Sequence, residues 1–125
     1  EADLTETVLI NTSAERASFR KAMMKNVRFV GETMLDYADF TGADVSESNL
    51  REAEINRANF TEAGMNQADF GGSNLRHTVF DRSVGVEARF NKAVLEHASL
   101  YRANLMEGSM YKAKISSADF TGACL

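Results

Sequence analysis

The sequence predicts an all-β solenoid, in which the chain winds into a four-sided coil whose turns stack along one axis. Three observations predict it. A small residue recurs every five positions, an apolar residue follows it two positions later, and the apolar residues repeat in kind every twenty positions. The 125 residues, of which 44% are apolar, are enough for one core but not for two typical domains. We therefore expect a single domain, residues 1–125.

The five-residue period runs without interruption from Thr33 to the end of the sequence. Every fifth residue from Thr33 is small, and every fifth residue from Leu35 is apolar except Gly85. A helix would rotate successive apolar positions by about 140°, and a straight strand would place them on alternate faces. Residues two apart share a face only in an extended segment. Each unit is therefore predicted to be a short extended run followed by a corner of about 90°.

Four such corners close a square, so the sequence should also repeat every twenty residues. The apolar positions bear this out, because residues 35, 55, 75, 95 and 115 are aliphatic and residues 40, 60, 80 and 120 are Phe, with Leu100 between them. We expect these aromatic rings to stack along one inner edge of the coil, one above another at sheet spacing.

Two places depart from the regular pattern. Residues 2–29 carry the same unit in another frame, so one extra residue lies near 30–32. Counting back one coil and that residue from Phe40 reaches Phe19, so we interpret the shift as a bulge or widened corner within the domain. Gly85 leaves an inner position empty, and we expect a local bulge there, with Val84 or Val86 folding inward.

The repeated units, such as "ADF" at 38–40 and "ANL" at 103–105, resemble the A(D/N)LXX signature of the pentapeptide-repeat family over essentially the whole chain. The resemblance implies a right-handed quadrilateral parallel β-helix of about six coils. Uniform repetition without an inserted loop or motif predicts a non-catalytic structural or protein-interaction scaffold, and many members of this family have no assigned biochemical role. Such members are frequent in cyanobacteria and in the thylakoid lumen, so the expected compartment is the thylakoid lumen of a plant or cyanobacterium, or the cytoplasm.

Charge is concentrated in the middle of the chain. Residues 31–70 hold nine acidic residues and only two basic ones. This acidic belt consists of Glu32, Asp36, Asp39, Asp44, Glu47, Glu52, Glu54, Glu62 and Asp69. Two interpretations stay open: a solubilising surface whose Asp side chains bond to the corners, and a docking face for a basic protein partner.

A second function is implied by part of the same family. Some members mimic duplex DNA and modulate DNA gyrase, a type II topoisomerase, in the manner of quinolone-resistance proteins, and the acidic belt would suit that role. Those members usually carry an apolar dimerisation helix after the coils, whereas the last residues here, "SSADFTGACL", continue the repeat. The total charge of −4 is also modest for a DNA mimic.

Other classes of function receive no support from the sequence. It contains no Gly-x-Ser-x-Gly, phosphate-loop or HExxH motif, so we expect no enzyme, no cofactor and no small-molecule ligand. The net negative charge argues against direct nucleic-acid binding, and the short apolar runs argue against a membrane span. The open rungs at the two ends of a coil stack make end-to-end self-association an expected property.

Three side chains invite a metal or redox interpretation. His77 and His97 are twenty residues apart and should stack on one outer corner, where a chance surface pair is the simplest explanation. Cys124 is the only cysteine and is expected at an edge or leaning inward. We predict no metal site from these residues.

Overall fold

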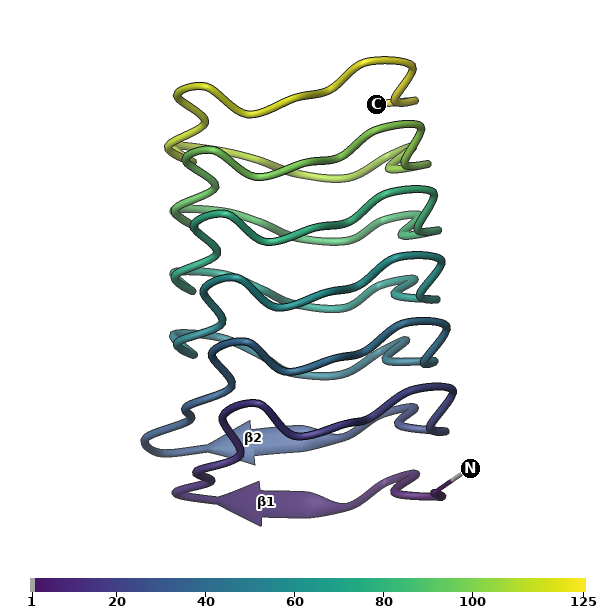
Figure 1. Ribbon diagram of the computed structural model, residues 1–125, viewed down its shortest axis with the longest axis vertical. Helices are drawn as coiled ribbons and strands as arrows, with labels where there is room; N and C mark the ends of the chain where they lie inside the picture. The colour runs from purple at the N-terminus through teal and green to yellow at the C-terminus, as the bar shows by residue number, and fades with distance from the viewer. Residues whose placement is uncertain (1) are drawn as a thin grey trace.

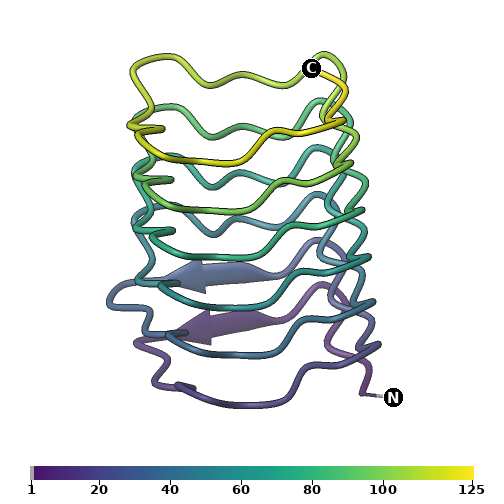
Figure 2. The same cartoon turned by 45° about the horizontal axis from the view of Figure 1, so that its top comes forward.

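The chain is wound into a single stack of coils, with the N-terminus at one end and the C-terminus at the other (Figure 1). The computed structural model describes residues 2–125. Parallel bridges link each coil to the next, and one column of bridges runs through Asp3, Met23, Asp44, Gly64, Val84, Asn104 and Cys124. The step is twenty residues, or four five-residue units, except for twenty-one between Met23 and Asp44. The tilted view shows the same closed outline in every turn (Figure 2). The molecule is a right-handed parallel β-helix, as the resemblance of its repeated units implies.

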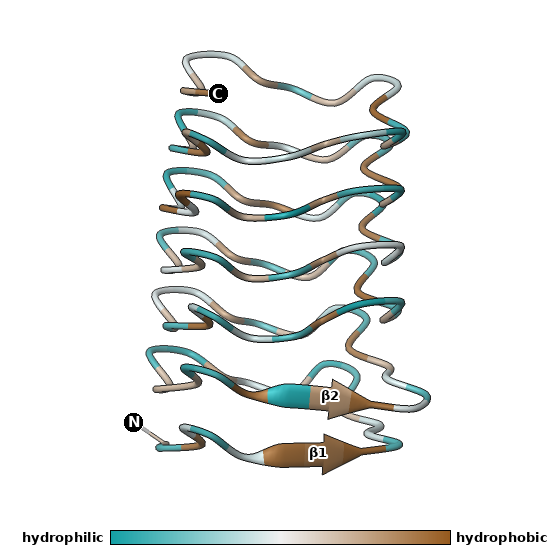
Figure 3. Ribbon diagram, turned by 180° about the vertical axis from the view of Figure 1, so that it is seen from behind, coloured by the Kyte–Doolittle hydropathy of each residue, from teal (hydrophilic) through white to brown (hydrophobic). Residues whose placement is uncertain are grey.

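Backbone pairing between successive coils extends over few residues on each side, because the corners interrupt it. Among residues 2–125, only β1 (Val8–Ile10) and β2 (Arg28–Val30) pair over three residues, with Val8 opposite Arg28. Elsewhere each side contributes a single bridged residue. Figure 3 shows the apolar character of β1, whose Val8 and Ile10 are 42% and 67% exposed. Within residues 2–125, no helix is long and apolar enough to cross a membrane.

Each corner is a β-turn that begins at the inner apolar residue. The N–H of Ala63 donates to the carbonyl of Phe60 over 3.0 Å, and Glu62, the third residue of this four-residue turn, has a φ of 59°. A positive φ at the third residue is the mark of a type II turn. The small residue that closes the turn leaves room for the chain to change direction, which explains why Ala, Ser or Thr occupies this position in most units.

We name the four sides of the coil by their inner residues: the Leu35, Phe40, Val45 and Leu50 sides. The predicted aromatic column is confirmed on the Phe40 side, where the rings of Phe40 and Phe60 stack with centroids 4.5 Å apart. On the opposite side Phe70 and Phe90 stack at 5.0 Å, and the two columns meet edge to face, as Phe60 and Phe70 do at 5.7 Å. All four rings are fully buried, so aromatic side chains fill the middle of the coil.

The extra residue near 30–32 widens one corner. Bridges before it join residues twenty apart, and those that span it join residues twenty-one apart, as Ser13 and Met34 do. Gly31 has a φ of 78°, and a β-carbon at this position would collide with the side-chain oxygen of Asn11. That oxygen accepts a hydrogen bond from the Glu32 N–H over 3.1 Å. Glycine therefore suits this corner, because a side chain here would be strained at the positive φ and would displace the Asn11 side chain that bonds to Glu32.

The expected bulge at Gly85 is absent, and that prediction is wrong. Val84 bridges to both neighbouring coils and is 45% exposed, and the Gly85 N–H donates to the Asn104 carbonyl over 2.8 Å. The space is filled by Met65 from the preceding coil, whose Cγ and Cε would lie 2.9 Å from a β-carbon at Gly85. A flexible thioether side chain adapts to the vacancy, so the backbone does not move.

Candidate interaction surface

The acidic belt surrounds the coil instead of forming one face. Asp39, Asp44, Asp69 and Glu54 occupy the outward position on four different sides, because consecutive units lie on consecutive sides. The other five acids lie at corners. A flat partner would therefore meet only part of the belt at a time.

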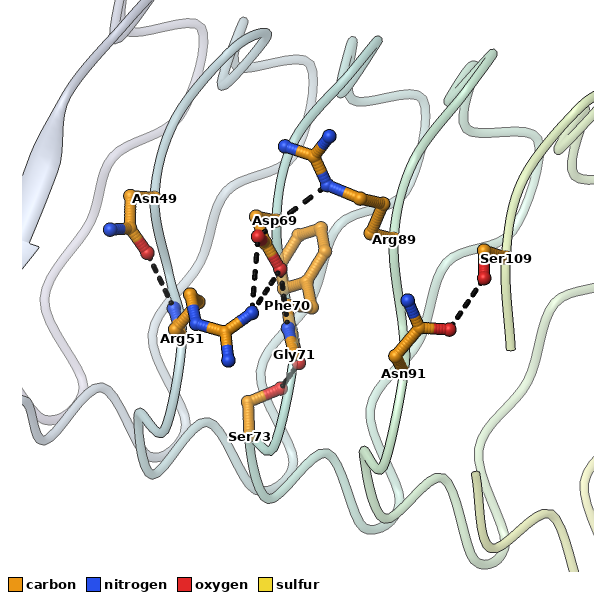
Figure 4. Close-up of polar contacts among 9 residues, drawn as sticks. All are labelled: Asn49, Arg51, Asp69, Phe70, Gly71, Ser73, Arg89, Asn91 and Ser109. Atoms are coloured by element: carbon orange, nitrogen blue, oxygen red, sulfur yellow. Dashed lines mark hydrogen bonds and ion pairs between the residues drawn. The ribbon is translucent and has the colours of Figure 1, made fainter. Parts of the chain in front are cut away.

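The aspartates of the belt also bond to the next corner. The Asp39 carboxylate accepts from the Thr41 N–H over 2.9 Å, and the Asp69 carboxylate accepts from the Gly71 N–H over 2.9 Å. Asparagine does the same where it takes this slot, as in the 3.0 Å bond from the Arg51 N–H to Asn49 (Figure 4). The preference for Asp or Asn in this slot therefore has a structural cause.

The contacts of Asp39 also affect the protonation of its carboxyl group. Burial raises the pKa of its carboxyl group, but hydrogen bonds from the Thr41 hydroxyl and N–H and the charge of Arg20 outweigh that effect. The pKa of Asp39 consequently lies below its usual value of 3.8.

Basic residues of neighbouring coils compensate four of the nine belt acids. Asp69 lies between Arg51 and Arg89, at 3.3 Å and 3.4 Å (Figure 4). The other pairs are Arg20–Asp39 at 3.0 Å, Lys25–Glu47 at 3.2 Å and Arg82–Glu62 at 3.9 Å. Exposed pairs of this kind contribute about 0 to 1 kcal/mol each, so they matter more for the surface charge than for stability.

The remaining acids gather mainly at one corner. Glu32 and Glu52 lie where the Leu50 side turns into the Leu35 side, and Glu54 is the first outward residue after this turn. We call these three residues the acidic corner; with Thr33 and Met34 they line a shallow hollow of about 250 Å³. A larger open hollow of about 920 Å³ adjoins it, beside the widened corner; its lining includes Phe29, Val30, Glu32, Arg51 and Glu52. None of the three acidic side chains has an ion-pair partner within residues 2–125.

The two other belt acids lie apart from this corner. Asp36 is at the corner after the Leu35 side, where its carboxylate accepts from the Asn56 N–H over 2.7 Å. Asp44 accepts from the Ser46 N–H over 3.0 Å on the Val45 side. Both are therefore engaged in corner hydrogen bonds.

His77 and His97 stack as expected, with ring centroids 5.0 Å apart and planes at 6°. The stack belongs to a longer column of planar groups, in which Arg16 and Arg57 flank the Tyr37 ring at 4.6 Å and 5.8 Å. Our predictions from the sequence did not extend the histidine pair to Arg16 and Tyr37, although the twenty-residue spacing, continued across the extra residue, places all five side chains on one corner.

The described part of the chain brings together no group of three or more side chains suited to a metal ion. Cys124 is exposed in the last rung, where it bridges to Asn104.

Fold and surface together define a repeat solenoid built from five-residue units. The pentapeptide-repeat family model matches eight copies, over residues 1–31, 38–77, 65–100 and 88–125. The chain belongs to the pentapeptide-repeat family. No curated protein matches the sequence.

Solved structures share the fold at low identity. Two trypsin-treated variants of QnrB1, a plasmid-mediated fluoroquinolone resistance protein, are 17% and 16% identical, with TM-scores of 0.60 and 0.61. Each match covers 96% of this chain and 66% or 65% of the other chain. A pentapeptide-repeat protein from the thylakoid lumen of Arabidopsis thaliana is 24% identical over 99% of this chain and 65% of that one, with a TM-score of 0.32. The chain thus spans just under two thirds of the length of these structures, and the likeness concerns the fold alone.

Proposed function

We propose that the protein is a non-catalytic scaffold that presents a rigid, regularly patterned surface to a protein partner. The observation that carries this proposal is the uninterrupted run of five-residue units from Thr33 to Leu125, with a core closed by side chains. Phe60, Phe70 and Phe80 are all 0% exposed, so their rings fill the interior that an enclosed pocket would need. Catalysis requires converging polar groups in such a pocket.

The acidic corner is the part of the belt that best suits a basic protein partner. Glu32, Glu52 and Glu54 are exposed and form no ion pair with any residue of 2–125, whereas Asp39, Glu47, Glu62 and Asp69 are already paired. Charges that remain free are the ones that steer and orient an oppositely charged partner. The proposed docking surface is therefore one corner of the belt, not the whole belt.

Affinity capture tests this proposal. The chain with Glu32→Lys, Glu52→Lys and Glu54→Lys should lose partners that the unchanged chain captures from a source lysate. A matched control, Glu87→Lys with Glu107→Lys, reverses charge at another corner and should retain them. Circular dichroism establishes that all three proteins are folded. Equal capture by all three proteins would mean that the acidic corner is not the docking surface. An enzymatic activity that is present in the folded protein and lost on unfolding would contradict the scaffold proposal itself.

Modulation of DNA gyrase is the second candidate, and the charge arrangement does not favour it. A DNA mimic needs an extended negative surface, but Arg51 and Arg89 of adjoining coils lie against Asp69 and interrupt the belt. The fold likeness to QnrB1 concerns architecture and not activity. A supercoiling assay with purified gyrase is expected to show no effect of micromolar protein, and inhibition or protection would revive this candidate.

A further inference from the structure

One corner of the coil carries a column of charges that changes sign halfway along the molecule. The column follows the turn from the Leu50 side to the Leu35 side and contains Glu32, Glu52, Gly72, Lys92 and Lys112. Backbone hydrogen bonds stack its coils: the Glu52 N–H donates to the Gly71 carbonyl and the Lys92 N–H to the Tyr111 carbonyl, over 2.9 Å and 2.8 Å. We call this column the bipolar edge.

The four charged side chains of the bipolar edge are available to a partner. All of them are exposed, and none forms an ion pair within residues 2–125. Lys112 lies over its neighbour Tyr111, 5.2 Å from the ring centroid, and both project from the corner. Two acids therefore occupy one half of the edge and two bases the other, with Gly72 between them.

The charges of the bipolar edge are complementary to those of a second copy of the same edge that runs in the opposite direction. Neighbouring rungs are about 4.8 Å apart, so a second copy running antiparallel places its Lys92 opposite Glu52 and its Lys112 opposite Glu32. Gly72 then faces Gly72 and allows the two backbones to approach. A parallel copy in register would instead oppose like charges at every rung. Among these two alignments, the pattern selects the antiparallel one, which has two-fold symmetry.

Surface shape follows the same symmetry. The hollow of about 920 Å³ lies beside the acidic half and is lined in part by Phe29, Val30 and Glu32. The side chain of Tyr111, next to Lys112 in the basic half, is 64% exposed. The inversion that pairs Lys112 with Glu32 also brings Tyr111 to Gly31, which lines this hollow next to Val30. A projecting aromatic side chain facing a hollow is a typical anchor of a protein interface.

We propose that the bipolar edge binds a second copy of this chain in an antiparallel, two-fold arrangement, with Tyr111 of each copy entering the hollow of the other. The inference rests on the proposed role of the acidic corner as a protein-binding surface, and it names the partner. Contact along one edge buries less than the roughly 1,600 Å² of a standard interface. The association is therefore weak, and salt weakens it further by screening the four charge pairs.

Charge reversal provides the test, measured by sedimentation velocity at low salt over rising protein concentration. The unchanged chain should reach the mass of two chains, and added salt should return it to the mass of one. Two variants should stay monomeric, because like charges then meet in the antiparallel pair. The basic-to-acidic variant carries Lys92→Glu and Lys112→Glu, and the acidic-to-basic variant carries Glu32→Lys and Glu52→Lys. A 1:1 mixture of the two variants should associate again, as should the variant that carries all four reversals.

Matched controls separate this edge from other contacts. Reversal of Glu87 and Glu107 to Lys should leave the association unchanged, and Tyr111→Ala should weaken it; circular dichroism establishes the fold of each variant. A monomeric chain at millimolar concentration and low salt would overturn the proposal. So would equal association of both charge-reversed variants, which would point to the ends of the coil, or a mixture that stays monomeric. A monomeric chain that still captures a basic partner through the acidic corner would overturn only this inference and leave the proposed function standing.

Discussion

At the scale of single residues, the corners impose a backbone conformation that most side chains avoid. Within the described chain, twenty residues other than glycine have a positive φ, and they occupy the same place in successive turns. Most carry long polar side chains, as Glu62 and Arg82 do, which extend into solvent and avoid branching at the β-carbon. The conformation costs about 1–2 kcal/mol for a residue with a β-carbon, so the choice of residue matters at each corner.

Glu62 allows this cost to be measured. Glu62→Val should lower the free energy of unfolding by about 1–2 kcal/mol more than Glu62→Gly, because a branched side chain is strained at φ 59° and glycine is not. Urea unfolding of both variants gives the comparison. At the outward position of Glu54, the order of the two variants should reverse: Glu54→Val should be more stable than Glu54→Gly, since valine suits an extended segment better than glycine does. The same order at both sites would contradict the assignment of strain to the corner.

Asp39 links one residue to the pH dependence of stability. Its pKa is lower in the folded chain than its usual 3.8, so its charged form stabilises the fold above that pH, and this contribution is lost as the pH falls through the lower, folded value. Asp39→Asn keeps an oxygen for the Thr41 N–H but has no charge to lose. The unchanged chain should be more stable than the variant at about pH 6, and the difference should shrink toward about pH 3. Urea unfolding of both proteins between these pH values measures the difference in their free energies of unfolding. A difference that stays constant would mean that Asp39 does not contribute to the pH dependence of stability.

At the scale of the element, each side of the coil is a column in which a side chain depends on the residues above and below it. Gly85 and Met65 show this dependence, because the methionine of one coil occupies the space left by the glycine of the next. The sequence alone showed a missing side chain at Gly85 and suggested a bulge. It could not show that the neighbouring side chain is long and flexible enough to fill the space, because that depends on packing between coils.

Exchanging the two side chains tests this dependence. Met65→Ala alone should cost about 2–5 kcal/mol through the cavity it leaves, and Gly85→Met alone should cost about 1–3 kcal/mol or more through crowding. The double variant moves the methionine to the next coil, and it should recover most of the free energy of unfolding that the single variants lose. A double-mutant cycle measured by urea unfolding gives the coupling energy. Simple addition of the two losses would mean that Met65 does not fill the position of Gly85.

At the scale of the whole molecule, the sequence predicted the architecture well because every unit repeats the same physical requirement. The inward positions of Phe40, Phe60 and Phe80 followed from periodicity alone. The candidate site was less predictable. The nine belt acids were identified from local charge. The sequence did not show how they are distributed around the four sides, which of them pair with Arg20 or Arg89, or that lysines continue the bipolar edge. These features depend on which coils lie next to each other. A count along the sequence weighs all acids equally, whereas stacking neutralises some and leaves others free.

The widened corner offers a test of the whole stack, because one residue there changes the register of every coil that follows. Residues 30–32 form a corner with one residue more than the others, so deletion of Gly31 should give an ordinary two-residue corner and change the twenty-one-residue step to twenty. The shortened chain should remain folded, with a small loss from the bond between Asn11 and the Glu32 N–H. Deletion of Gly72 removes a residue from a corner that has none to spare, and it should prevent the coils above from stacking in register. Circular dichroism and urea unfolding distinguish the two deletions. Equal damage by both would mean that the extra residue is required by the stack, not merely accommodated in it.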